Sequence, residues 1–192
     1  MKKIKFPFKN HFYHNFIFYV IAAILSPSLI SYLIILKTNP KDGEIFNIFI
    51  EANLADKQGL NDFVREHTSG VKELNIYSSL SSLNVYTAVY ATQGLESDIL
   101  ILSESAFKES DCSNYLEIES SSKYFNATNK IFNDKHFGIE IFNGESGCLT
   151  SFLSYGNERY YAAINKNTFN GELFSKNEVN NIDLLMEAIL NG

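Results

Sequence analysis

The longest apolar stretch of the chain lies near its start, where Asn15–Leu36 forms a run of 22 positions without a charge. A helix needs about 20 mainly apolar residues to cross the hydrocarbon core of a bilayer, so this pattern predicts a transmembrane helix. The alternative is a cleaved secretory signal, whose apolar core spans only about 7–15 residues before a small-residue cleavage site. The run here is longer and ends in Leu36-Lys37-Thr38-Asn39, which favours an uncleaved anchor.

Three short apolar runs follow this stretch and predict strands. They are Glu44–Ile50, Val71–Tyr77 and Asp98–Leu102. The first of them is nearly continuous in apolar residues, which is typical of a strand buried on both faces, and the third predicts a short buried strand. Helical patterns separate the runs, and a strand–helix–strand–helix–strand order predicts right-handed crossovers and a parallel sheet.

Local signals mark the two helices between these strands. Asp56 is a typical N-cap residue, and apolar positions return after it at helical spacing as far as His67. Asn84 opens the second helical pattern, and Gly94 ends it.

The second half of the chain has weaker patterns. Residues 108–135 are polar and serine-rich, and the alternation of apolar positions over 137–141 predicts a half-exposed strand. Two strand-like runs, Cys148–Tyr155 and Glu158–Ile164, flank Gly156-Asn157, and a two-residue turn of this kind predicts a β-hairpin.

A final helix is predicted over about Lys176–Leu190, because Ser175 and Glu178 have capping-box spacing before an apolar face. The sequence thus predicts an α/β fold. Its three-layer, partly parallel sheet carries a C-terminal antiparallel hairpin and follows one transmembrane helix.

These patterns divide the chain into a cytoplasmic basic tail (1–14), the transmembrane helix (15–36), a linker (37–43) and an extracytoplasmic α/β domain (44–192). The tail contains four lysines and no acidic residue, and short basic segments stay on the cytoplasmic side. We therefore predict a single-pass protein of the cell membrane, with its N-terminus in the cytoplasm and its C-terminal domain outside.

Charge narrows the range of partners for the outer part. From Lys37 onward the chain carries 12 basic and 22 acidic residues, a balance of −10, because four of its 16 lysines and arginines precede this point. Such an excess of acid argues against nucleic acid and against an anionic lipid surface as binding partners.

The cysteines and histidines of the chain allow a disulfide but indicate no metal site. Cys112 and Cys148 are the only cysteines, and an oxidising exterior would permit a disulfide between them, although two free thiols are the equal alternative. No spacing of cysteine, histidine or carboxylate residues resembles a metal site, and no motif indicates a cofactor.

The order of the pieces EIFNIFIEAN, NDFVREH, VKELNIYSS, VYTAVYATQGLES and DILILSES resembles the opening of a type II extracytoplasmic solute-binding protein. The segment YYAAINKNTF, followed by a terminal helix, is similar to the later part of such proteins, where a strand re-enters the core. The resemblance implies a reduced, one-lobe domain on a single-span membrane protein of the kind found in low-GC Gram-positive bacteria. It implies solute recognition beside an ABC-type transporter.

Polar residues follow each of the three predicted parallel strands. They are Glu51 and Asn53 after the first, Ser78, Ser79, Ser81 and Ser82 after the second, and Ser103, Glu104 and Ser105 after the third. Ligands of open α/β sheets bind beyond the carboxyl ends of the strands, so these residues are the candidate ligand-binding site. Hydroxyls suit a small polar solute, and the two glutamates favour a cationic group. The alternative is structural, because serines after strands often cap helices or form turns.

The sequence therefore favours a membrane-anchored binding or accessory module, with a small polar solute, a transporter or another membrane protein as its partner. The alternative is a structural or interaction protein of the cell envelope that assembles through its outer domain and the helix around Pro27, without a small ligand. An enzyme is the less favoured class. Glu51 and Glu104 would be its candidate carboxylate pair, and the G-x-S-x-G and Gly-rich phosphate motifs are absent.

Overall fold

The computed structural model describes residues 8–80, 86–129, 135–176 and 180–191. It divides the chain into two compact units, Met1–Asn39 and Pro40–Gly192. The first contains the long helix α1 (Phe8–Thr38), in which Phe18–Ile35 is long and apolar enough to cross a membrane and has no buried share. A signal sequence would satisfy the same criteria, so the spanning role of α1 remains a prediction.

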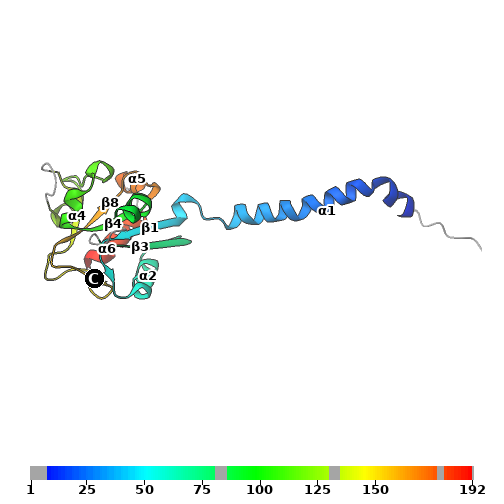
Figure 1. The fold of residues 1–192 in the computed structure, drawn as a ribbon. Helices are drawn as coiled ribbons and strands as arrows, with labels where there is room; N and C mark the ends of the chain where they lie inside the picture. Colours follow the sequence, from blue (N-terminus) through cyan, green and yellow to red (C-terminus); the bar gives the residue numbers. More distant parts are fainter. Residues whose placement is uncertain (1–7, 81–85, 130–134, 177–179, 192) are drawn as a thin grey trace, which may run out of the picture. The chain divides into compact units, whose positions relative to one another are not determined.

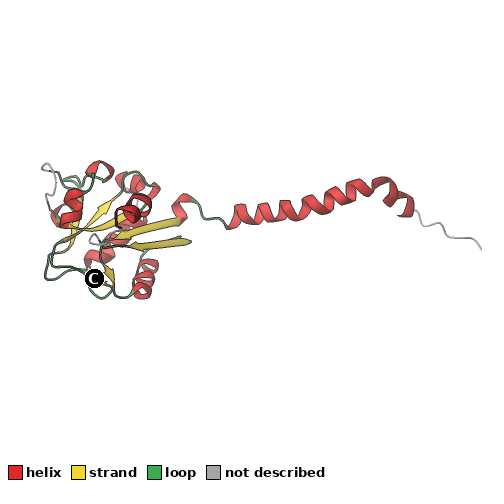
Figure 2. Cartoon of the chain, in the orientation of Figure 1, coloured by secondary structure: helices red, strands yellow, loops and turns green. Residues whose placement is uncertain are grey.

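The second unit is a mixed α/β domain (Figures 1 and 2). Its described strands are β1 (Ile45–Ile50), β2 (Asn53–Leu54), β3 (Glu73–Ser78), β4 (Ile99–Ser103), β5 (Thr128–Asn129), β6 (Gly138–Phe142), β7 (Leu153–Ser154) and β8 (Tyr160–Ile164). Its longer described helices are α2 (Lys57–Glu66), α3 (Tyr86–Val89), the π-helix η2 (Tyr90–Gly94), α4 (Glu104–Glu109), α5 (Phe169–Ser175) and α6 (Asn181–Asn191). Single 3₁₀ turns are η1 (Asp42–Glu44), η3 (Cys112–Asn114) and η4 (Phe125–Ala127).

The main sheet has the strand order β3-β1-β4-β8-β6-β5. Strand β1 lies between β3 and β4 and is parallel to both, with Ile48 opposite Ile76 on one side and Ile99 on the other. Strands β1 and β4 are mostly buried on both faces, as is usual for parallel strands, whereas β3 lies at the edge of the sheet and is buried only at Ile76. The predicted parallel sheet is confirmed, although the predicted start of the second helix at Asn84 lies outside the described residues.

The predicted hairpin is wrong. Strand β8 pairs antiparallel with β4 and with β6, whereas β7 pairs with β2 in a separate small sheet. Two-residue hairpin turns of the primed types require a positive φ at their first central residue. Gly156 and Asn157 do not have one, so their segment connects two sheets instead of reversing one ribbon. Every residue of β8 is buried, as expected for a strand that lies between two others inside the sheet.

Strand β6 also differs from its prediction, since it lies between β8 and β5 and is mostly buried. Gly138, Ile139, Ile141 and Phe142 are all buried, and only Glu140 is partly exposed. Alternation along the sequence suggested one exposed face, but Phe107 of α4 packs over Gly138 on that face. The half-exposed assignment is therefore wrong.

The terminal helix begins later than its capping-box spacing predicted. Ser175 is the last residue of α5, so it does not open the next helix, and Glu178 lies outside the described residues. Instead, the Asp183 N–H donates to the Asn180 side chain at 3.1 Å, which makes Asn180 the N-cap of α6.

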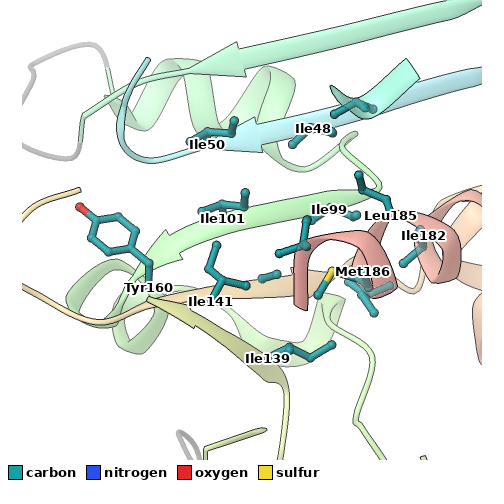
Figure 3. Close-up of a cluster of buried hydrophobic side chains, with 14 of the residues drawn as sticks. Ile48, Ile50, Ile99, Ile101, Ile139, Ile141, Tyr160, Ile182, Leu185 and Met186 are labelled. Atoms are coloured by element: carbon teal, nitrogen blue, oxygen red, sulfur yellow. The ribbon is translucent and has the colours of Figure 1, made fainter. Parts of the chain in front are cut away.

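Two apolar clusters cover opposite faces of the sheet, because neighbouring residues of a strand point to opposite sides. On the α6 face, isoleucines of β1, β4 and β6 pack beneath Ile182, Leu185 and Met186, as Figure 3 shows. On the α4 face, the cluster contains Phe49 and Phe107. Helices thus lie on both sides of the sheet, which confirms the three-layer arrangement.

The two cysteines belong to these opposite faces. Cys112 is a buried member of the α4-face cluster, whereas Cys148 packs against the α6-face cluster. Both thiols are free, so the structure does not form the disulfide that the sequence allowed. Burial raises the pKa of each thiol above its usual value, which keeps both protonated at neutral pH.

Helix α2 supplies a first prediction, because the Asp56 carboxylate accepts the Gly59 N–H at 2.8 Å and so caps the helix as expected. Replacing Asp56 with alanine should lower the free energy of unfolding by about 1 kcal/mol, the usual contribution of an N-cap. Urea denaturation followed by tyrosine fluorescence measures the loss. The control is Asp62→Ala within the same helix, an exposed position where we expect a change below about 0.5 kcal/mol.

Candidate functional site

The carboxyl ends of β1, β3 and β4 meet at one edge of the sheet, because these strands are parallel. Strand β8 is antiparallel to them, so its first residue lies at the same edge, where Tyr160 pairs with Ser103. The edge therefore combines residues that follow three strands with residues that precede a fourth. We call the group Glu51, Ser79, Ser103, Ser105, Glu158 and Tyr160 the strand-end cluster.

Glu51 lies directly after β1, the middle one of the three parallel strands, and is only 3% exposed. Its carboxylate accepts the backbone N–H of Ser103 at 2.8 Å, and its own N–H donates to the Ile101 carbonyl at 2.8 Å. Among the described residues, no lysine, arginine or histidine forms an ion pair with it. The carboxyl-end edge of the sheet therefore holds a fixed, buried acceptor, where a cationic group would be favoured.

Ser103 caps a helix, which is the structural alternative that the sequence analysis left open for the serines after strands. Its hydroxyl accepts the Ala106 N–H at 3.3 Å and so caps α4, and it lies 3.2 Å from the Ser105 hydroxyl. Because the same residue donates its backbone N–H to Glu51, Ser103 joins the end of β1 to the start of α4.

Ser105 is tied to a carboxylate that the sequence analysis missed. Its backbone N–H and its hydroxyl both donate to the Glu158 carboxylate, each at 3.0 Å. Glu158 comes just before β8, and the sequence placed it inside the second strand of a hairpin. The antiparallel pairing of β8 with β4 brings it here, and no local pattern would have revealed this long-range pairing.

Glu104 is engaged away from Glu51. Its carboxylate pairs with Lys108 at 2.6 Å, one turn along α4, and the hydrogen bond raises the pKa of Lys108. Both side chains are largely exposed, so the pair contributes little to stability. Glu51 and Glu104 thus have separate partners, and this arrangement does not support their use as an acid–base pair.

The serines after β3 are only partly placed. Ser79 is 7% exposed, and its N–H donates to the Ile50 carbonyl at 3.1 Å, next to Glu51. Its buried hydroxyl has no hydrogen-bond partner among the described residues. Ser78 is exposed at the end of β3, and Ser81 and Ser82 lie outside the described residues.

Asn53 also departs from the edge. It is exposed and pairs with Ser154 in the small β2-β7 sheet. Its amide side chain therefore faces solvent, outside the strand-end cluster.

The pKa of Tyr160 reflects the negative charges at this edge of the sheet. Burial raises the pKa of its hydroxyl, and the nearby carboxylates of Glu51 and Glu158 raise it further. The hydroxyl accepts the Gly156 N–H at 3.2 Å. The edge is thus negative in potential and suited to cations. Within the described residues, no group of three or more histidine, cysteine or carboxylate side chains gathers to hold a metal ion.

Asp98 has a structural role at the opposite edge of the sheet. It precedes β4, is 3% exposed and accepts the Asn47 N–H at 2.9 Å. Burial raises the pKa of this carboxyl group, while that hydrogen bond and those from Thr168 and Asn170 oppose the rise. The aspartate of the DILIL run therefore fixes the register between β1 and β4.

Comparisons with protein-family models, with curated proteins and with solved structures found no match to this chain.

Proposed function

We propose that the chain is a membrane-anchored, extracytoplasmic binding or accessory module. Helix α1 would tether the domain, and the strand-end cluster would recognise a cationic group of a small polar solute, such as an amino acid or a peptide end. A transporter of the ABC type is the proposed partner, as the resemblance to solute-binding proteins implies.

One observation carries this proposal, namely the buried carboxylate of Glu51 at the end of the central parallel strand, which forms no ion pair within the described part of the chain. Ligands of open α/β sheets bind at this edge, and a fixed acceptor there gives a cation a defined contact.

Ligand-dependent melting tests the solute proposal. We expect the full-length protein in lipid nanodiscs to melt higher with at least one member of a panel of amino acids, oligopeptides and sugars. A ligand at 100 times its Kd stabilises a protein by about 2.7 kcal/mol, which corresponds to roughly 5–10 °C for a domain of this size.

Glu51→Gln is the matched variant, because glutamine keeps an acceptor for the Ser103 N–H and removes the charge. It should weaken binding of the cationic ligand at least tenfold, whereas Glu109→Gln, at the exposed end of α4, should leave binding unchanged. A flat response across the panel would contradict solute binding. Co-purification with a defined membrane complex would then favour the envelope interaction protein instead.

A further inference from the structure

Helices α2 and α6 cover the same face of the sheet and leave a groove between them. Leu60 and Val64 of α2 belong to one apolar cluster with Ile182, Leu185 and Ile189 of α6. Two neighbouring hollows are lined by residues of both helices and have Ala188 in their shared wall. This groove is separate from the strand-end cluster, and none of that cluster's residues lines it.

The first hollow is mainly apolar and has a volume of about 310 Å³. Its walls include Phe63, Phe152, Leu149, Ala188 and Ile189, and the rings of Phe63 and Phe152 lie 5.6 Å apart. A concave, largely apolar space of this size lies at the lower end of the range for small-molecule sites.

The turn that closes the apolar hollow is held in an unusual conformation. Leu149 has a φ of 58°, in the left-handed region that residues other than glycine rarely adopt. Its carbonyl accepts the N–H groups of Phe152 and Leu153, each at 2.9 Å, which maintains the turn. Such strain persists only where the surroundings enforce it, so this wall of the hollow is preformed.

The second hollow, of about 430 Å³, is acidic. Glu66 and Glu187 line it from α2 and α6, and Glu187 also pairs with Lys123 at 2.6 Å. No ion pair involves Glu66 among the described residues. The Nδ1 of His67 lies 2.8 Å from the Phe63 carbonyl and must donate to it, which leaves Nε2 as an acceptor in the neutral ring. The polar end of the groove therefore offers mainly negative charge and acceptors.

We propose that this groove binds a small amphiphilic cation. The apolar body of the ligand occupies the hollow beside Phe63 and Ala188, and its ammonium group lies at Glu66, because Glu187 is already paired with Lys123. Charge complementarity selects this occupant, because the outer part of the chain is acidic overall and the charged side chains among the described residues of the groove all lie at one end. The site is independent of the proposed solute site, so either proposal stands if the other fails.

Three probes with one apolar body test this proposal on the full-length protein in lipid nanodiscs. They are 4-phenylbutylamine, 4-phenylbutanol and 4-phenylbutanoate, and the readout is the NMR signals of the Ala188 and Ile189 methyl groups. We expect saturable shifts with the amine and about fivefold weaker binding of the alcohol, the range of one exposed ion pair. The carboxylate should bind more weakly still.

Variants separate the two parts of the site. Glu66→Gln should weaken the amine about fivefold and leave the alcohol unchanged, whereas Glu51→Gln should change neither. Ser151→Trp, on the exposed rim, should block binding of all three probes without altering the core. Ala188→Phe should block their binding as well, because the larger side chain fills the hollow itself. Equal binding of the three probes, or the absence of saturable shifts at Ala188 and Ile189, would overturn the proposal.

Discussion

Replacing Phe107 with alanine should lower the free energy of unfolding by about 3–5 kcal/mol, the usual range for a fully buried phenylalanine. The Phe107 side chain is 0% exposed, and its ring lies 5.3 Å from that of Tyr115 and 5.9 Å from that of Tyr161. The residue anchors α4 to the sheet, and its ring also packs over Gly138, where a Cβ would lie 3.0 Å from it.

This substitution should also disturb the strand-end cluster, because Ser103 and Ser105 are held by the first turn of α4. Urea denaturation gives the loss in stability, and Phe169→Ala is the matched control. Phe169 is 49% exposed at the start of α5, so its removal should cost less than about 1 kcal/mol. Similar losses for the two variants would mean that the α4 face is not packed as described.

Two lysines in the middle of α1 should release the chain from the membrane. Ile24 and Leu25 are 64% and 59% exposed in this helix, as residues that face lipid would be. A lysine at the centre of a spanning helix costs about 2.5–3.5 kcal/mol of insertion free energy, so the double variant loses roughly 5–7 kcal/mol. We expect most of the Ile24→Lys, Leu25→Lys protein to leave the carbonate-washed membrane fraction.

The control for this experiment exchanges the two residues as Ile24→Leu and Leu25→Ile, which keeps the apolar character and should keep the protein in the membrane. The released double-lysine protein should retain the urea midpoint of the outer domain, since the two apolar clusters contain no residue of α1. If the lysine variant stays with washed membranes, α1 is not what holds the chain there.

The parallel half of the fold was predictable because its signals are local. Strands β1 and β4 are short apolar runs, β3 places Leu74 and Ile76 two residues apart, and Asp56 marks the start of α2 within one turn of chain. The partner of β8 was not predictable in this way. Its pairing with β4 and β6 depends on which apolar strand fills the centre of the sheet. The Gly156-Asn157 turn instead suggested pairing with the run just before it in the sequence.

The candidate site was likewise predictable only where its residues are marked by local signals. The topology rule placed Glu51 and Ser103 at one edge, and they form a hydrogen bond there. The burial of Glu51 could not be read from the sequence, because it depends on contacts such as that with Ser103, 52 residues away along the chain. Glu158 was missed because it lies 53 residues from Ser105 along the chain. The groove between α2 and α6 was missed because two amphipathic helices give no sign of how closely they pack.

The most direct test of the whole account asks on which side of the membrane the acidic domain lies. Both native cysteines are first replaced with alanine, and a single cysteine is then introduced at Glu145, which is exposed, or at Lys3 in the basic tail. A membrane-impermeant maleimide should label Glu145→Cys in intact cells of a single-membrane bacterial host, and Lys3→Cys only after lysis. Labelling in the reverse pattern would place the domain in the cytoplasm and contradict the proposed function.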